Sequence, residues 1–273
     1  MASQREPRPV VLVGCGRLGS AILEGWLATG TVAPSALVIL TPSQKPAAQA
    51  ALALGARVNP PTVALARATT LVLAVKPAMW RAAIEPFAEA LAPDAVVVSV
   101  MAGVKAGDIA LAIGRPVARV MPTTGVAQAR GVAAIWSDVD LAREVAAGLF
   151  RPIAELVDLA DEGLMDAATA TAGSAPAFIL AFTQALARAG VAQGLDADAA
   201  IRLVGGALRS AAAGLEAGET IEALIARIAS PGGTTSAGLH AMTTSGDLDR
   251  VAAAAIDAAV ARARTLYPET THL

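Results

Sequence analysis

A glycine-rich turn between an apolar run and a helix-like segment constrains this chain more than any other feature. Residues 9–13 have the length and composition of a buried strand, and residues 20–28 have helical spacing. Between them lies Gly14-Cys15-Gly16-Arg17-Leu18-Gly19, whose glycines permit a tight turn, close approach of a pyrophosphate and close helix–strand packing. The pattern predicts a dinucleotide site with the cofactor-binding residues Gly14, Gly16, Arg17, Leu18 and Gly19. The alternative is a tight strand–helix turn that binds no ligand.

Apolar runs alternate with helix-like segments through the first half of the chain. Strands are expected at residues 9–13, 36–40, 70–75, 95–100, 117–121, 131–136 and 154–159, and helices at 20–28, 46–54, 79–91 and 138–150. Continuous apolar strands that alternate with helices are typical of a parallel sheet covered on both faces. Residues 1–160 are therefore predicted to form an α/β domain of the Rossmann type that binds NAD(P).

The residues after the second expected strand bear on the choice of cofactor. An NAD site usually has Asp or Glu there to bond the ribose 2′-hydroxyl, but no acidic residue lies between Glu24 and Glu85. The chain has Thr41-Pro42-Ser43-Gln44-Lys45 instead, so that Thr41, Ser43 and Lys45 are expected to contact the cofactor. A hydroxyl and a cation suit a 2′-phosphate, which favours NADPH and leaves NADH possible. The alternative for Lys45 is an exposed lysine at a helix start.

Three further strand ends are expected on the same edge of the sheet as the glycine turn. Ligands of open α/β sheets bind at the carboxyl ends of the strands. Each of these ends is followed by Pro or Gly and taken singly would be an ordinary turn. Together they predict a cleft for nicotinamide and substrate, with the cofactor-binding residues Val75, Lys76, Pro77, Ala102, Gly103 and Thr123.

The pattern changes near Asp161, after which no strand-like run follows. Alanine-rich helices are expected at residues 166–193, interrupted near Gly173-Ser174-Ala175-Pro176, and at 197–217, 221–229 and 248–266. Asp196 and Asp247 are suited to be N-caps, and Gly194 and Gly246 are suited to end helices. Residues 161–273 are predicted to form an all-helical domain for substrate binding and dimerisation.

The stretch between Asp166 and Arg188 carries no charge and is nominally long enough to span a bilayer. Its hydroxyl residues, Pro176 and Gln184 favour a helix buried in a protein interface instead. An intertwined homodimer would cover such a helix better than a monomer, and the alternative is a monomeric helical lid. The N-terminus lacks the apolar core of a signal peptide, so a soluble cytoplasmic protein without membrane partners is expected.

The composition argues against several classes of function. With 273 residues, a net charge of −2 and 3% aromatic residues, the chain has no electrostatic footprint for nucleic acid. Cys15 is the single cysteine, and His240 and His272 are the only histidines, so no metal site is expected. An alcohol dehydrogenase needs a proton acceptor, for which the histidines and Tyr267 are poorly placed and Lys76 alone remains. An imine is readily protonated from water, so the shortage of general acids favours C=N reduction.

A second glycine-rich segment, Ser230-Pro231-Gly232-Gly233-Thr234-Thr235, precedes a helix-like run at residues 236–242. Glycines leave backbone N–H groups accessible, and at a helix N-terminus such groups bind a carboxylate or a phosphate. The alternative is a turn between two helices that is capped by Ser or Thr.

In combination, these motifs resemble the Δ1-pyrroline-5-carboxylate reductase family along nearly the whole chain. The resemblance is carried by residues 14–19, Ala74-Val75-Lys76-Pro77, Ala102-Gly103-Val104, and residues 230–235 with Gly238-Leu239-His240. It implies that NAD(P)H gives hydride to the imine carbon of pyrroline-5-carboxylate, which yields L-proline. It also implies a substrate site at Ser230, Gly232, Gly233 and Thr234, and a catalytic Thr235 whose hydroxyl bonds near the ring nitrogen. Family members are dimers through interlocked C-terminal helices, and many form decamers.

The chain departs from the family pattern at two places. It has Pro122-Thr123-Thr124-Gly125 where Pro-Asn-Thr-Pro or Thr-Asn-Thr-Pro is common, and Ala172-Gly173-Ser174-Ala175 where the family has Ser-Gly-Ser-Gly. Thr123 lacks the two-way hydrogen-bonding amide of asparagine, and Gly125 is expected to loosen the same loop. The leading interpretation is an NADPH-dependent reductase of pyrroline-5-carboxylate. The alternatives are a reductase of a related cyclic imino acid and a non-catalytic NADP(H)-binding sensor.

Overall fold

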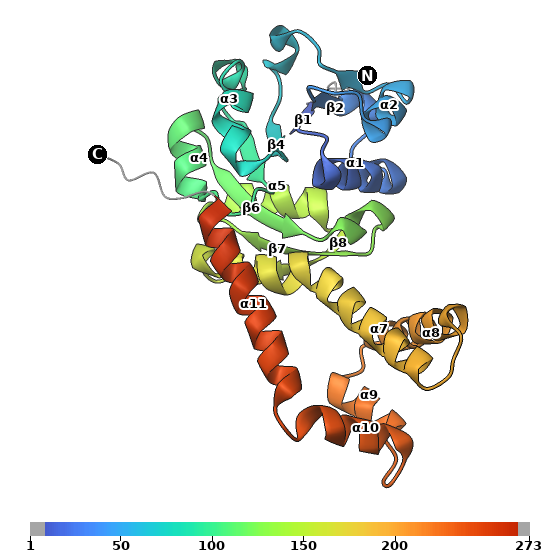
Figure 1. Ribbon diagram of the computed structural model, residues 1–273. Coiled ribbons are helices and arrows are strands. Elements are labelled where there is room, and N and C mark those ends of the chain that lie inside the picture. The colour runs from blue at the N-terminus through green and yellow to red at the C-terminus, as the bar shows by residue number, and fades with distance from the viewer. Residues whose placement is uncertain (1–8, 267–273) are drawn as a thin grey trace. The chain divides into compact units, whose positions relative to one another are not determined.

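The computed structural model describes residues 9–266, which form two compact units (Figure 1). The first unit holds the described residues up to Gly173 together with those from Ala259 onward, and the second comprises Ser174–Ala258. Residues 161–173 belong to the first unit, so the two units meet further along the chain than the predicted boundary at residue 160. The strands do end before that boundary, because no strand follows residue 158 in the described part of the chain. The boundary itself stays a prediction. Tyr267 and His272, like residues 1–8, lie outside the described residues.

The first unit is built on an eight-stranded sheet with the order β3-β2-β1-β4-β5-β6-β7-β8. The strands are β1 (Val10–Val13), β2 (Leu37–Leu40), β3 (Arg57–Val58), β4 (Thr70–Leu73), β5 (Val96–Ser99), β6 (Val117–Pro122), β7 (Gly131–Trp136) and β8 (Ala154–Asp158). Every predicted strand is present, and the short β3 at the edge was not predicted. The order reverses at β1, so the glycine turn after this strand opens at the switch point where α/β sheets bind ligands.

One pair of strands breaks the expected parallel pattern. β7 runs antiparallel to β6, with Met121 opposite Ala134, and β8 is parallel to β7. A parallel return needs a crossover of about a dozen residues or more, whereas β6 and β7 are joined by a short turn that includes residues Thr124–Gln128. The prediction of a parallel sheet is therefore confirmed for β1 to β6, and β7 and β8 extend this sheet in the opposite direction.

Helices cover both faces of the sheet. α1 (Arg17–Thr29), α2 (Pro46–Ala53) and α5 (Asp140–Phe150) contribute to one apolar core, and α3 (Trp80–Ile84) and α4 (Ala106–Ile113) to the other. Successive strand residues alternate between the cores, as Val11 and Leu12 do. The Trp26 indole N–H donates to Leu149 O at 2.9 Å and joins α1 to α5.

The helix predicted at residues 79–91 is shorter than expected. α3 ends at Ile84, and only a single 3-10 turn, Ala88–Ala90, follows before β5. Pro86 explains the early end, because proline lacks an N–H and its ring clashes with the preceding turn of a helix. The helix α4 was not predicted as a separate element.

The remaining described helices are α6 (Met165–Ala168), α7 (Ala175–Ala192), α8 (Ala197–Glu216), α9 (Ile221–Ile228), α10 (Thr234–Thr243) and α11 (Asp247–Leu266). The expected interruption before Pro176 is a π-helical segment, Thr169–Ser174. Such a segment fits the missing N–H of Pro176 at the start of α7.

The helix ends agree with the predicted signals except at Asp247. Asp196 caps α8 by accepting from Ala199 N at 2.9 Å, and Gly194 and Gly246 have φ of 100° and 66°. Asp247 is the first helical residue of α11 and not its N-cap. Its carboxylate accepts hydrogen bonds from Ser245 and Arg250, and these two contacts lower the pKa of Asp247 below its usual range.

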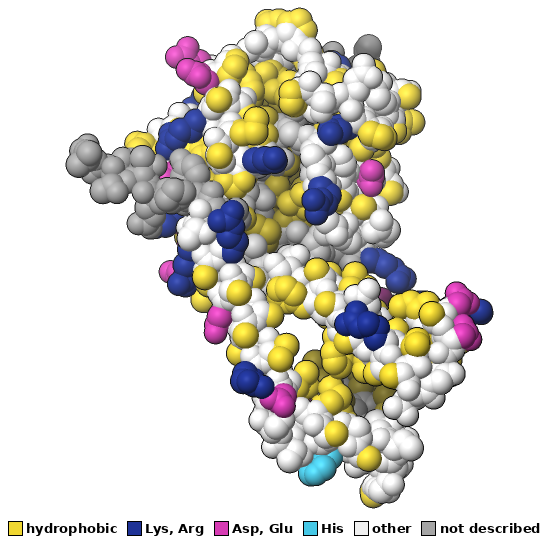
Figure 2. Space-filling model, in the orientation of Figure 1, with side chains coloured by type: hydrophobic (Ala, Val, Ile, Leu, Met, Phe, Trp, Pro, Cys, Tyr) yellow, Lys and Arg dark blue, Asp and Glu magenta, His cyan; other side chains and the backbone are white. Residues whose placement is uncertain are grey.

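Large apolar side chains of the second unit are exposed on the single chain, among them Leu180 at 60% and Leu203 at 61%. Figure 2 shows hydrophobic side chains on the surface of this unit. The continuous helical stretch Glu162–Ala192 is long and apolar enough to cross a membrane, and 11% of its most apolar window is buried within the chain. These side chains therefore need cover that the described residues of one chain do not supply.

Candidate active site

The glycine turn after β1 is held tightly against β4. Gly14 has a φ of 97°, and a Cβ at this position would lie 2.6 Å from Ala74 O. A Cβ at Gly19 would collide with Gly14 O. Only glycine fits either position, so the first and third glycines serve the turn and the helix–strand packing.

Gly16, the middle glycine, has a different reason to be glycine. It is the N-cap of α1, its φ of −74° is open to any residue, and a Cβ there would meet no atom within 4 Å. Neither the backbone nor the packing of the chain requires glycine here. The N–H groups that begin α1 have no intrahelical partner and suit an anion. The space in front of Gly16 therefore fits a pyrophosphate that comes close to the backbone.

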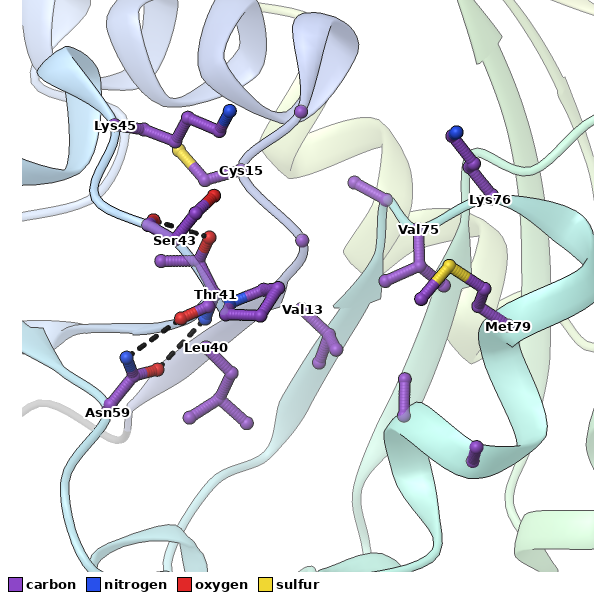
Figure 3. A pocket seen from close by; sticks show the side chains of 16 residues that line it. Val13, Cys15, Leu40, Thr41, Ser43, Lys45, Asn59, Val75, Lys76 and Met79 are labelled. Carbon is purple, nitrogen blue, oxygen red and sulfur yellow. Dashed lines mark hydrogen bonds between the residues drawn. The ribbon is translucent and has the colours of Figure 1, made fainter.

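A cavity of about 660 Å³ opens beside this turn (Figure 3). It lies at the carboxyl ends of β1, β2 and β4, and Ala82 and Ala83 of α3 also line it. Its lining includes seven of the predicted cofactor residues, namely Gly14, Gly16, Thr41, Ser43, Lys45, Val75 and Lys76. The structure thus brings together the predicted residues of three strand ends around one cavity.

The cavity also contains residues that sequence reasoning missed. Asn59 follows β3, and its amide bonds to the backbone of Thr41 at 2.8 and 2.9 Å. Cys15 and Met79 complete the lining near the glycine turn and α3. The one sequence signal for Asn59 was its rarity, because it is the single asparagine of the chain.

Other predicted cofactor residues do not line this cavity. Arg17, Leu18 and Gly19 form the first turn of α1, Pro77 begins a 3-10 turn after Lys76, and Ala102 and Gly103 follow β5. Thr123 is 9% exposed, and its hydroxyl accepts from Val132 N at 3.2 Å. This hydroxyl therefore fastens β6 to β7. The cofactor roles of all these residues stay predictions.

The second glycine-rich segment begins α10 in the second unit. Gly232 has a φ of 71°, and a Cβ at Gly233 would lie 2.5 Å from Ser230 Oγ. Gly233 N–H donates to Ser230 O at 3.0 Å and closes the turn. The N–H groups of Thr234, Thr235 and Ser236 are those that a helix start leaves without intrahelical partners.

These contacts change the expected anion site in one detail. The Gly233 N–H already bonds to Ser230 O, so it is not free to hold a carboxylate in this structure. Thr235 is partly exposed in the first turn of α10. His240 lies further along the same helix, where its Nδ1 is 3.2 Å from Thr244 Oγ1. Among residues 9–266, no three His, Cys, Asp or Glu side chains gather as metal ligands would.

A strand–glycine turn–helix unit that opens on a cavity at the sheet's switch point defines the first unit as a dinucleotide-binding domain. Residues 9–103 match the family model described as NADP oxidoreductase coenzyme F420-dependent, and residues 162–266 match pyrroline-5-carboxylate reductase dimerisation. The chain is 31% identical to the pyrroline-5-carboxylate reductase of Escherichia coli over 235 residues, which covers 84% of this chain and 87% of that protein. The chain therefore belongs to the pyrroline-5-carboxylate reductase family.

Solved structures agree with this fold. The pyrroline-5-carboxylate reductase of Coxiella burnetii is similar with a TM-score of 0.86 and 24% identity, covering 96% of this chain and 99% of that one. The pyrroline carboxylate reductase of Plasmodium falciparum with NADP bound has a TM-score of 0.80 and 22% identity over 96% and 98% of the two chains. The predicted family, fold class and nicotinamide cofactor are confirmed.

Proposed function

We propose that the protein reduces the C=N bond of Δ1-pyrroline-5-carboxylate to L-proline with NADPH, the last step of proline biosynthesis. The observation that carries the proposal is the pairing, in one chain of this family, of the cofactor cavity and a helix start that suits a carboxylate. NADPH, when bound, supplies the hydride. Residues 14–19 hold its pyrophosphate, and Thr41, Ser43 and Lys45 hold its adenosine ribose phosphate.

The α10 turn binds the substrate carboxylate in this proposal. Gly232 and Thr234 bring to it N–H groups that have no hydrogen-bond partner among residues 9–266, and Ser230 and Gly233 shape the turn through their mutual hydrogen bond. Thr235 places a hydroxyl next to these groups and hydrogen-bonds near the ring nitrogen. A protonated imine needs no dedicated acid from the chain, which fits the poor supply of histidine and tyrosine.

We also propose that the chain works as a cytoplasmic homodimer that can assemble further into a decamer. The dimerisation model spans residues 162–266, the same region in which α7 and α8 leave large apolar side chains exposed. Burial of each Leu or Phe side chain against a partner's helices would stabilise the dimer by about 1.5–3 kcal/mol, so these exposed side chains favour association. A membrane is then not needed to cover Glu162–Ala192.

A second candidate function is reduction of a different cyclic imino acid, and the turn between β6 and β7 favours it. Here Gly125 is built into the turn: Arg130 N donates to Gly125 O at 3.0 Å, and a Cβ at Gly125 would lie 2.8 Å from Arg130 O. A proline would not fit this turn. The segment Thr124–Gln128 is thus a closed 3-10 turn and not the loosened loop that was expected. Its sequence departs from the family pattern next to Thr123.

A panel of substrates tests both candidates. Purified protein is given NADPH and a series of five- and six-membered cyclic imino acids, and kcat/KM is measured for each. The leading proposal expects the highest kcat/KM for Δ1-pyrroline-5-carboxylate. A higher value for another ring would favour the second candidate. Tight NADPH binding without turnover of any imine would instead indicate a sensor.

A further inference from the structure

Asn59 takes a backbone conformation that few residues adopt. Its φ is 47°, in the left-handed region, where asparagine is tolerated better than most residues besides glycine. Its N–H donates to Ile39 O at 2.9 Å, which ties this conformation to β2. The side-chain amide faces Thr41, across the edge of the larger cavity (Figure 3).

The Asn59 amide holds both backbone groups of Thr41. Oδ1 accepts from Thr41 N at 2.9 Å, and Nδ2 donates to Thr41 O at 2.8 Å. The Thr41 hydroxyl donates to Ser43 O at 3.1 Å and extends the constraint along the chain. The two bonds need a donor and an acceptor on one short side chain, which an amide has and a carboxylate does not.

The segment held in this way lies between two cavities. Thr41, Pro42, Ser43 and Asn59 line both the cavity of about 660 Å³ and a smaller one of about 120 Å³. Thr41 is buried, whereas Pro42 and Ser43 are exposed, so the hydrogen bonds of Thr41 fix the point from which the exposed part of this segment extends. Within residues 9–266, the Ser43 hydroxyl and the Lys45 ammonium have no hydrogen-bond or ion-pair partner of their own, which leaves both available to a ligand.

We propose that Asn59 is a positioning residue that sets the preference for NADPH over NADH. By clamping Thr41 it holds the segment that presents Ser43 and Lys45 to the 2′-phosphate. The inference rests on the proposed use of NADPH. NADH lacks this phosphate, so loss of the clamp costs NADPH more than NADH.

The test compares Asn59→Gly and Asn59→Asp with wild type in the full-length protein. Glycine keeps the left-handed backbone and removes the clamp, whereas aspartate removes the donor and adds a negative charge beside the phosphate site. Gln49→Ala is the matched control, since it removes an amide that lines only the smaller cavity. Dissociation constants for NADPH and NADH are measured by cofactor fluorescence, and KM for each cofactor is measured with pyrroline-5-carboxylate.

We expect Asn59→Gly to raise Kd for NADPH about tenfold and to leave Kd for NADH within about a factor of two. Asn59→Asp should raise Kd for NADPH further, while Gln49→Ala should match wild type. If Asn59→Gly leaves the ratio of Kd for NADPH to Kd for NADH unchanged, the inference is overturned while the proposed function stands. A wild type that prefers NADH would overturn the proposed cofactor choice and this inference together. If that wild type still reduces pyrroline-5-carboxylate with NADH, the proposed substrate stands.

Discussion

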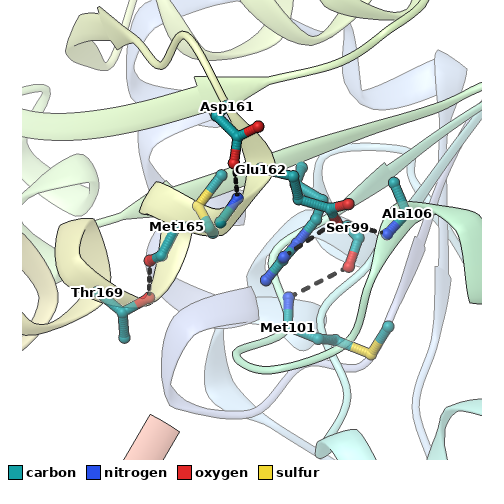
Figure 4. Close-up of polar contacts among 9 residues, drawn as sticks. Ser99, Met101, Ala106, Asp161, Glu162, Met165 and Thr169 are labelled. Carbon is teal, nitrogen blue, oxygen red and sulfur yellow. Dashed lines mark hydrogen bonds and ion pairs between the residues drawn. The ribbon is translucent and has the colours of Figure 1, made fainter. Parts of the chain in front are cut away.

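Glu162 accepts a hydrogen bond from the buried guanidinium of Arg119, and the same carboxylate oxygen caps α4. Glu162 Oε1 lies 3.0 Å from Arg119 Nη1 and 2.7 Å from Ala106 N. Figure 4 shows Glu162 beside Ala106. The Arg119 side chain is 5% exposed, and its Nε and second terminal nitrogen are buried without a hydrogen-bond partner in the described chain. The buried charge on β6 therefore depends on this one carboxylate, which belongs to the region matched by the dimerisation model.

Removal of that carboxylate should destabilise the protein strongly. Glu162→Ala leaves a buried charge unpaired, which costs on the order of 3 kcal/mol. Thermal unfolding should show a Tm lower by about 6–12 °C. The control is Glu219→Ala in the exposed pair with Arg227, whose loss costs about 1 kcal/mol or less. Equal Tm shifts for the two variants would contradict the assignment.

Gly16→Ala should weaken cofactor binding without harming the fold. The added methyl group occupies the open space through which a pyrophosphate approaches, so we expect Kd for NADPH to rise by about tenfold or more. Gly107→Ala is the control, because a Cβ there also meets no atom within 4 Å. Isothermal titration with NADPH and thermal unfolding are the two measurements. A lowered Tm with unchanged affinity would show that Gly16 serves the fold alone.

Lys45→Ala should weaken NADPH more than NADH. An ammonium near a 2′-phosphate makes a charge-assisted contact, so we expect about a tenfold rise in Kd for NADPH at low salt. The difference should shrink as ionic strength rises, because salt screens exposed charges. Arg151→Ala removes an exposed cation elsewhere and serves as the control. If Lys45→Ala shifts both cofactors together, the assignment of Lys45 to the 2′-phosphate is wrong.

Thr235→Ala should lower kcat/KM for the imino acid by about tenfold, since in the proposed site it removes one hydrogen bond near the ring nitrogen. Binding of NADPH should not change, because the residue belongs to α10 and not to the cavity at the sheet edge. Thr243→Ala, at the other end of α10, removes a hydroxyl that bonds only to Leu239 O in the described structure. Steady-state kinetics and NADPH titration decide the matter, and an equal loss of NADPH affinity would show that the loop is misassigned.

Phe182→Glu should break the proposed dimer. The side chain is 45% exposed on α7 of the single chain, and a charge buried at an interface without a partner costs several kcal/mol, of order 3 or more. Sedimentation velocity should show a monomer in place of a dimer. Leu111→Glu, at an α4 position that is 75% exposed, should sediment as wild type does. A monomeric wild type, or a dimeric Phe182→Glu, would contradict the interface.

Much of the fold could be predicted because its signals are local. The strand, turn and helix of residues 9–28 follow each other directly, and the apolar runs of β4 and β5 are continuous. The short β3 carries no such run and escaped prediction. The early end of α3 has a local cause in Pro86. The apolar spacing of residues 79–91 predicts a longer helix, and the sequence alone does not show which of the two signals prevails.

The candidate site was predicted less completely, because its details depend on contacts between distant residues. Ser43 and Lys45 were found from the missing acid after the second strand. Asn59 lies 18 residues from Thr41, and their bonds exist only because β3 pairs with β2. Thr123 was predicted at the cofactor, whereas its hydroxyl bonds to Val132 N across the β6–β7 pair.

The family, the dinucleotide turn and the alternation of strands and helices could be read from the order and spacing of neighbouring residues. The reversed direction of β7 and β8, the clamp on Thr41, the closed turn at Gly125 and the dependence of Arg119 on Glu162 are visible only in the folded chain. Each of these follows from which elements lie side by side. Hydrogen bonds and charges act across a few ångströms in space, and the distance along the chain does not reveal which groups will meet.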